Sequence, residues 1–428
     1  MIDIKLLRAD PECVKENIRK KFQDGKLALV DEVLALDAQF RAARTRADYL
    51  RAQRNSISKL IGMLMAKGKR DEAEETKRQV TAMADEMAQL AEKEALLEEE
   101  IKKRMLVIQN LIDDAVPIGR DDSENVEVER FGDPFVPDFE VPYHVDIMER
   151  LGGIDLDSAR KTSGNGFYYL CGPVALLQSA ILSYARDFMV DRGFTYYIPP
   201  FMIRSSVVTG VMSFSEMENM MYKIEGEDLY LIGTSEHSMI GKFIDTILDE
   251  NELPKLLTSY SPCFRKEVGA HGIEERGVYR IHQFEKQEMI VVCKPEDSRR
   301  YYDVLWRNSV DFFRSLDIPV RTLECCSGDL ADLKVRSVDV EAWSPRQGKY
   351  FEVGSCSNLG DAQARRLGIR IRGKEKGNYL AHTLNNTVVA PPRMLIAFLE
   401  NNLNADGSIR IPDALRPYLR KERIDPVR

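Results

Sequence analysis

The stretches SPCFRKE at residues 261–267 and YRIHQFEKQEMIVV at residues 279–292 decide the expected fold of the second part of the chain. Both alternate apolar and polar residues, which is the side-chain period of a half-buried β-strand. A polar segment with three glycines separates them. The pattern therefore predicts two antiparallel strands joined by a loop over residues 268–278.

The second predicted strand gathers ionisable side chains on one face. Side chains on a strand repeat every two residues. Five residues therefore share this face: Arg280, His282, Phe284, Lys286 and Glu288. A solvated sheet face is one interpretation, but it does not explain a phenylalanine in the middle. A ring between cations suits a nucleotide, whose base would stack on Phe284 while Arg265 and Arg280 contact the phosphates.

Two later segments carry further candidate ligands. In KYFEVGSCSN at residues 349–358, Glu352 and Ser355 offer a carboxylate and a hydroxyl to one divalent cation, and Mg²⁺ prefers such oxygen ligands. An edge strand that leads into a polar turn is the competing interpretation. In HTLNNTVVAPPR at residues 382–393, a proline break places Arg393 in the first turn of a helix, where the helix dipole disfavours a cation. A bound anion beside Arg393 would explain this placement.

The first part of the chain follows a coiled-coil pattern. Over residues 29–64, apolar residues recur at alternating steps of four and three, with Arg54 as the one polar exception. A second, less regular run covers residues 80–111. This spacing, sustained over about five heptads, predicts coiled-coil helices. A short break, in which Gly68 ends the first helix and Asp71 caps the second, predicts an antiparallel hairpin.

This hairpin has a thin apolar seam and offers no pocket for chemistry. It is either a dimerisation coiled coil or spacer, or a rod that reaches a large partner. Basic residues along its first helix and at its tip suit phosphate contacts, although solvated charge also explains them. These residues are Arg44, Arg51, Arg54, Lys67, Lys69 and Arg70. Composition separates a helical cap and hairpin at residues 1–114 from a linker at residues 115–140 and a larger domain at residues 141–428.

The overall charge and the cysteine pattern exclude several classes of protein. The 428 residues carry 61 lysines and arginines against 69 aspartates and glutamates, a net charge of −8. Proteins that coat nucleic acid are usually basic, so a nucleic-acid role here requires a local patch. The seven cysteines are scattered without a CxxC pair, which disfavours structural zinc and a disulfide framework. Since the apolar run of about 18 residues that a membrane span needs is also missing, we expect a cytoplasmic multidomain protein with no membrane contact.

In this order, the segments resemble the signature motifs of class II aminoacyl-tRNA synthetases. The stretch RGFTYYIPPF at residues 192–201 is similar to motif 1, the dimer-interface element of that class. The two strands described above resemble motif 2, and the strand, proline break and helix around Arg393 resemble motif 3. Together with the N-terminal hairpin, SCSN at residues 355–358 and HTLN at residues 382–385, the set resembles the seryl-tRNA synthetase family over essentially the whole chain.

This resemblance implies an α+β fold, in which an N-terminal antiparallel helical coiled-coil hairpin precedes a class II synthetase catalytic domain built on a mostly antiparallel sheet flanked by helices. It implies ATP-dependent activation of serine to seryl-adenylate and transfer of the seryl group to the 3′ end of tRNA(Ser). Mg²⁺ would accompany ATP, and zinc would not be required. The hairpin would bind tRNA, and the catalytic domain would form a homodimer.

The resemblance also implies roles for individual residues. The catalytic set is Arg265, Arg393 and Glu288. The ATP-binding set is Arg265, Glu267, Arg280, Phe284, Glu352, Ser355 and Arg393. Glu352 and Ser355 would also hold Mg²⁺. In the family, the residue matched by Arg265 contacts the α-phosphate, the one matched by Arg393 contacts the γ-phosphate, and the ring matched by Phe284 stacks on adenine.

The same resemblance describes the amino-acid end of the site. The serine-binding set is Thr234, Glu236, Arg265, Glu288, Asn385 and Thr387. Thr234 and Glu236 match the element that holds the α-ammonium group, while Glu288 and Thr387 match the grip on the hydroxyl. Several positions depart from the usual residues of the family: the run His237-Ser238-Met239, and Gly354, Asn386 and Val388. Asn386 and Val388 would narrow or reshape the serine site.

Three alternatives to a housekeeping enzyme follow from these departures and from the hairpin. The first is a specialised paralogue with a biosynthetic or resistance role or with another small amino acid. The second is a non-catalytic binding protein with the synthetase fold. The third is a coiled-coil scaffold, which predicts no affinity for ATP.

Overall fold

The computed structural model describes residues 2–267, 277–374 and 377–427, with the side chains of residues 214–215 left aside. The chain divides into two compact units, Met1–Gln109 and Asn110–Arg428. The loop predicted over residues 268–278 lies mostly outside the described residues. No helix in the described ranges is long and apolar enough to cross a lipid bilayer.

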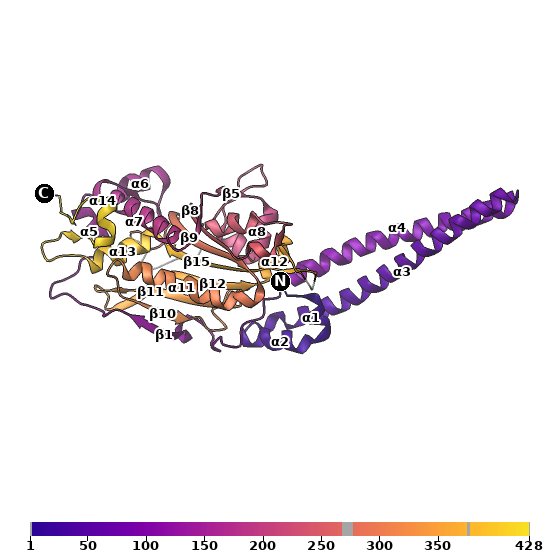
Figure 1. Cartoon of the computed structure of the whole chain (residues 1–428), viewed down its shortest axis with the longest axis horizontal. Coiled ribbons are helices and arrows are strands. Elements are labelled where there is room, and N and C mark those ends of the chain that lie inside the picture. The colour runs from indigo at the N-terminus through magenta and orange to yellow at the C-terminus, as the bar shows by residue number, and fades with distance from the viewer. Residues whose placement is uncertain (1, 268–276, 375–376, 428) are drawn as a thin grey trace. The chain divides into compact units, whose positions relative to one another are not determined.

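In its described residues, the first unit is helical. Its elements are α1 (Ile4–Ala9), α2 (Pro11–Lys20), a 3₁₀ turn (Asp24–Lys26), α3 (Leu27–Ala66) and α4 (Arg70–Val107). α3 and α4 lie side by side as a long antiparallel hairpin (Figure 1), which confirms the predicted coiled-coil arm. Gly68 turns the chain with φ +75°, a conformation that favours glycine. The predicted cap at Asp71 is wrong, because α4 already begins at Arg70 and Asp71 lies in its first turn.

A buried carboxylate paired with two partly exposed arginines supports the apolar seam of the arm. The seam residues Val33, Ala43 and Leu50 are buried as the heptads predict. Beside them Asp37 is only 1% exposed, and it accepts hydrogen bonds from Arg8 Nε at 2.8 Å and Arg41 Nε at 2.9 Å. Burial alone would raise the pKa of Asp37, but the two guanidinium groups lower it below its ordinary value.

We predict that Asp37→Asn lowers the free energy of unfolding of the first unit by about 1–3 kcal/mol, because two guanidinium groups lose their buried anion. Urea unfolding followed by the helical circular dichroism signal measures this loss. Because the folded pKa lies below the unfolded one, the wild-type advantage is present at neutral pH. It disappears as the pH falls through the lowered pKa of Asp37. Asp48→Asn is the matched control, because Asp48 is exposed on the same helix and pairs with Arg51 in solvent.

The second unit is built on an eight-stranded sheet. Its strand order is β1 (Val126–Phe131), β10 (Val320–Glu324), β11 (Arg336–Ser344), β12 (Lys349–Gly360), β15 (His382–Val389), β9 (Gln283–Cys293), β8 (Lys255–Phe264) and β4 (Thr195–Tyr197). Neighbouring strands are antiparallel except for β4 and β8, which are parallel. The expected mostly antiparallel sheet flanked by helices is therefore confirmed.

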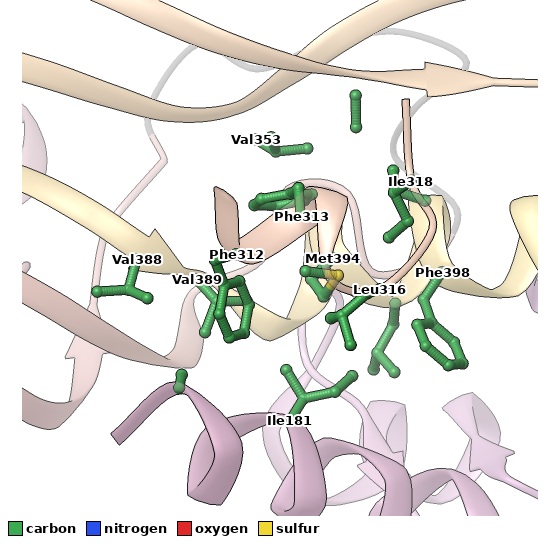
Figure 2. Close-up of a cluster of buried hydrophobic side chains, with 14 of the residues drawn as sticks. Ile181, Phe312, Phe313, Leu316, Ile318, Val353, Val388, Val389, Met394 and Phe398 are labelled. Atoms are coloured by element: carbon green, nitrogen blue, oxygen red, sulfur yellow. The ribbon is translucent and has the colours of Figure 1, made fainter. Parts of the chain in front are cut away.

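Helices pack on both faces of this sheet. On one face lie α7 (Gly172–Val190), α11 (Ser298–Arg314) and α13 (Pro391–Asn401), whose Ile181, Phe312 and Phe398 join Val388 of β15 in the main apolar core (Figure 2). On the other face, α8 (Ser205–Val211), α10 (Ser235–Gly241) and α12 (Ala362–Leu367) cover part of the sheet around Ile290 of β9.

Shorter elements complete the second unit. The remaining helices are α5 (His144–Arg150), α6 (Leu156–Ser163), α9 (Phe214–Met220) and α14 (Arg416–Leu419). A three-stranded sheet has the order β14 (Asn378–Leu380), β13 (Arg370–Arg372) and β7 (Ile247–Asp249). The strand pairs are β2 (Ile154–Asp155) with β3 (Tyr169–Leu170), β5 (Met202–Ile203) with β6 (Tyr230–Leu231), and β16 (Ile409–Arg410) with β17 (Arg423–Ile424).

The second predicted strand is shorter than its sequence pattern suggests. β9 begins at Gln283 rather than at residue 279. The backbone before it bends, because His282 N donates to Gly166 O while His282 O accepts from Arg265 N. The predicted shared face is therefore wrong for His282, whose ring lies 5.2 Å from that of Phe167.

Candidate active site

One cavity of about 640 Å³ opens on the face of the sheet that α8, α10 and α12 partly cover. Every residue expected to contact ATP, serine or Mg²⁺ lines it: Thr234, Glu236, Arg265, Glu267, Arg280, Phe284, Glu288, Glu352, Ser355, Asn385, Thr387 and Arg393. These residues lie up to 159 positions apart in sequence. The fold therefore brings together four stretches of the chain, at residues 234–236, 265–288, 352–355 and 385–393.

Arg265 and Phe284 form a cation–ring pair at one part of the cavity. Arg265 follows the last residue of β8, and its guanidinium carbon lies 5.3 Å from the centre of the Phe284 ring. Its Nε also donates to Gly233 O at 3.2 Å, which restrains the side chain. Nearby, Arg280 Nη1 donates to Glu267 Oε2 at 2.8 Å. A planar base and an anionic phosphate are the ligand groups that such an arrangement can bind.

Arg393 lies in the first turn of α13, as expected, and it already has an anionic partner. Its Nη1 donates to Glu352 Oε2 at 2.9 Å and to the Glu352 carbonyl at 3.0 Å, and its guanidinium lies over the ring of Tyr279. Burial opposes ionisation of Glu352, but Arg393 lowers the pKa of that carboxyl below its ordinary value. The carboxylate therefore explains part of the unfavourable helix position, and the Nε and Nη2 groups of Arg393 have three further N–H donors that an anion could accept from.

A bulge in β12 brings Glu352 and Ser355 to the same side of the sheet. Residues three apart on a regular strand point to opposite faces. Here Val340 pairs with Gly354 and Glu341 pairs with Glu352, so Val353 is an extra residue. Ser355 Oγ lies 3.3 Å from Lys334 Nζ and 3.1 Å from Ser337 Oγ. The result is a carboxylate and a hydroxyl that both line the cavity.

Two carboxylates and one ammonium group also line the cavity. Glu288 is 2% exposed, and its Oε2 lies 2.7 Å from Lys286 Nζ, while Thr387 Oγ1 donates to it at 3.4 Å. Glu236, in the first turn of α10, accepts a hydrogen bond from Gln363 Nε2 at 2.7 Å. Burial raises the pKa of Glu236 to about 7. When it is ionised, Glu236 has a neutral amide as its hydrogen-bond donor, so its carboxylate suits a cationic ligand group.

The predicted contacts of the hairpin lie in the first unit. All six basic residues are exposed: Arg44, Arg51 and Arg54 along α3, and Lys67, Lys69 and Arg70 at the turn into α4. Arg51 pairs with Asp48 and Lys69 pairs with Glu72. Exposed pairs of this kind are weak, so both cations are available to a phosphate partner.

Two family models match the chain. "Seryl-tRNA synthetase N-terminal domain" matches residues 1–112, and "tRNA synthetase class II core domain (G, H, P, S and T)" matches residues 220–402. The serine–tRNA ligase of Methanocella arvoryzae is 41% identical over 424 residues, which cover 98% of this chain and 99% of that protein. The chain belongs to the seryl-tRNA synthetase family. A serine–tRNA ligase of Pyrococcus horikoshii is 39% identical over 450 residues, covering 100% of this chain and 98% of that protein.

Solved structures agree with this family membership. The seryl-tRNA synthetase of Pyrococcus horikoshii complexed with ATP superposes with a TM-score of 0.94 at 37% identity, covering 100% of both chains. The cytoplasmic serine–tRNA ligase of Naegleria fowleri in complex with AMP gives a TM-score of 0.88 at 32% identity, covering 100% of this chain and 99% of that one. Prolyl-tRNA synthetase of Giardia lamblia shares the fold only, at 16% identity.

The two departures from the family on β15 do not reach the cavity. Along this strand Asn385 and Thr387 line the cavity, whereas Asn386 and Val388 point to the opposite face. Asn386 Nδ2 donates to Leu305 O and Ser309 Oγ, both at 2.8 Å, and Val388 lies in the apolar core (Figure 2). The expectation that these two residues narrow the serine site is therefore wrong.

Several cavity residues carried no clear signal in the sequence. Lys286 lies on the ionisable face that the alternation predicts, but this pattern alone indicates no ligand for it. Lys334 lies in an irregular segment before β11, where no periodicity marks it. His237 is 4% exposed, and burial lowers its pKa to about 3, so it is a neutral side chain. Tyr279 lines the cavity through its contact with Arg393, which is not visible in the sequence.

We predict that Asn386→Ala lowers the free energy of unfolding by about 1–3 kcal/mol, because it leaves the buried Leu305 carbonyl without its side-chain donor. Thermal unfolding of the full-length chain measures the change. The adjacent substitution Asn385→Ala removes the same chemical group from the cavity face and should cost less than half as much. Equal losses in the two variants would contradict the assignment of Asn386 to the packed face.

Proposed function

We propose that the chain activates serine with ATP and transfers the seryl group to the 3′ end of tRNA(Ser). The observation that carries this proposal is the convergence of the twelve expected ligand residues on one cavity. Membership of the seryl-tRNA synthetase family, with relatives crystallised with ATP and with AMP, supports it. The three alternatives from the sequence have no comparable support in the site.

In the first step, a carboxylate oxygen of serine attacks the α-phosphorus of ATP, and the bond to the departing pyrophosphate breaks. Arg265 contacts the α-phosphate and Arg393 the γ-phosphate, so developing negative charge meets fixed guanidinium groups. Phe284 stacks on adenine, and Glu267 with Arg280 lines the nucleotide. The step needs positioning and charge neutralisation rather than an acid–base pair.

In the second step, a hydroxyl of the terminal tRNA ribose attacks the acyl carbon of seryl-adenylate, and AMP leaves. Thr234 and Glu236 hold the serine ammonium group during both steps. Glu288 and Thr387 hold the hydroxyl, with Asn385 beside them. A site built to bond this hydroxyl rejects alanine and glycine, since its buried polar groups would otherwise stay unpaired.

Glu352 and Ser355 fit the role of Mg²⁺ ligands, because both offer oxygen atoms to the same cavity from the same side of β12. Mg²⁺ bound there would neutralise phosphate charge and orient the triphosphate. The proposal does not include zinc. No cysteine of the described residues lines the cavity, and the α-ammonium group of serine would have the carboxylate of Glu236 as its partner.

The proposal extends to assembly and location. We assign tRNA binding to the basic residues of the arm, since the matching family model covers residues 1–112. We place the homodimer interface at motif 1 and the helix before it: Ile198, in motif 1, is 65% exposed, and Leu176, in α7, is 60% exposed. The cytoplasm is the proposed location, as it is for the relative from Naegleria fowleri.

We predict that Arg265→Ala lowers serine-dependent ATP–pyrophosphate exchange by at least about 100-fold, because a charge contact to the α-phosphate is lost. The assay should be run with serine, threonine, alanine and glycine, and only serine should support exchange by the wild type. Arg307→Ala is the matched control. It removes an arginine that lies 4.3 Å from the ring centre of Trp306, outside the cavity, and should leave exchange unchanged.

Wild-type exchange with another small amino acid would support the specialised paralogue. No exchange with any of the four, together with ATP binding, would support a non-catalytic binding protein. No ATP binding at all would support the scaffold.

We predict that shortening the arm separates the two steps. Replacing residues 52–81 by a short glycine–serine turn removes the basic tip and keeps the Arg46–Glu86 ion pair between α3 and α4. The variant should retain serine-dependent exchange and lose tRNA charging, because the first step needs only the cavity. Loss of exchange in a variant whose second unit remains folded would contradict this division.

A further inference from the structure

Gln363 is a buried glutamine that contacts the site without lining it. It belongs to α12, which packs beside α8 and β15 (Figure 1), and it is 1% exposed. Its Nε2 donates to Glu236 Oε1 at 2.7 Å. Among the described residues, Gln363 is outside the set that lines the cavity, whereas Glu236 is part of it. Gln363 can therefore act on a charged ligand through the Glu236 carboxylate, which it contacts at the cavity wall.

Three contacts determine the orientation of the Gln363 amide. Nε2 faces the Glu236 carboxylate and the Val211 carbonyl at 3.2 Å, and when Glu236 is ionised both groups can only accept hydrogen bonds. Oε1 faces the hydroxyl of Thr383, which donates to it at 2.6 Å. Thr383 is fully buried on β15. The reversed amide would place two acceptors against its oxygen, so one orientation is strongly preferred.

The charges around Glu236 make this hydrogen bond important. Burial raises the pKa of Glu236, whereas the Gln363 amide lowers it. Glu288 of β9 raises it further, and two ammonium groups lower it: Lys286 of β9 and Lys334 of the segment before β11. A charge-assisted hydrogen bond inside a protein favours the ionised carboxylate, which is the form that can accept a bond from an ammonium group.

We propose that Gln363 is a positioning residue for amino-acid binding: aligned by Thr383 and Val211, it directs the Glu236 carboxylate toward the ammonium group of the substrate. The inference rests on the proposed function. It goes beyond that function because it assigns serine affinity to a residue outside the cavity. The two contacts that hold the amide come from Thr383 of β15 and Val211 of α8, and the amide itself belongs to α12. Three separate elements therefore set the direction of the Glu236 carboxylate.

The test is serine-dependent ATP–pyrophosphate exchange by full-length Gln363→Met, which keeps the side-chain length and removes the amide. The KM for serine should rise about 10-fold or more near neutral pH, because a hydrogen bond to a charged group is lost. The KM for ATP should change less than about 2-fold, because the proposed function assigns ATP to other residues of the cavity.

The pH profile distinguishes positioning from a general loss of structure. Without the amide, Glu236 holds its proton to higher pH, so a smaller fraction is ionised at any pH near its pKa. The serine KM of the variant divided by that of the wild type should therefore increase as the pH is lowered from about 8.5 to about 6.5. Thr383→Val, which keeps Gln363 but frees its amide to rotate, should give a smaller rise with the same pH trend. It also provides the test if Gln363→Met does not fold.

Gln287→Met is the matched control. Like Gln363, Gln287 is 1% exposed and lies outside the cavity lining. Its Nε2 donates at 2.8 Å to a buried threonine hydroxyl, Thr258 Oγ1, rather than to Glu236. It should lower stability without changing the serine KM or its pH dependence. An unchanged serine KM in Gln363→Met, or an equal rise in the KM for serine and for ATP, would overturn the inference. A wild-type enzyme without serine-dependent exchange would instead refute the proposed function.

Discussion

Alternation of side chains across one sheet is the constraint on which the second unit depends. On β9, Val291 enters the apolar core while Lys286 and Glu288 face the cavity. β15 divides its residues in the same way. One sheet therefore supplies both a packed core on one side and charged ligand groups on the other. A register shift of a single residue would exchange the two sets and place charges in the core, so the apolar face also fixes the direction of the chemistry.

Three carboxylates that line this cavity each have a partner that offsets the loss of hydration. Glu288 has Lys286, Glu352 has Arg393, and Glu236 has the amide of Gln363. Desolvating an ion without such a partner costs several kcal/mol. These pairs hold their side chains in place before any ligand arrives, so little reorganisation is needed when a charged substrate binds.

The two units meet different physical demands. The arm buries only a narrow seam of apolar residues, so paired charges such as Asp37 with Arg8 and Arg41 supplement its packing. The second unit has a large apolar core on which it can hold a polar cavity in a fixed geometry. Under the proposed function, the arm binds a long nucleic acid, and the second unit holds the substrates in place for group transfer.

Local periodicity determined a large part of the structure. The heptads predicted α3 and α4, and alternation predicted β8 and β9, because both signals come from neighbouring residues. The resemblance of short motifs supplied the twelve cavity residues. Only the tertiary structure decided the start of β9 at Gln283, the bulge at Val353, the inward direction of Asn386 and the contact of Gln363 with Glu236. These features depend on partners that lie tens to more than a hundred positions away, and no local pattern records such contacts.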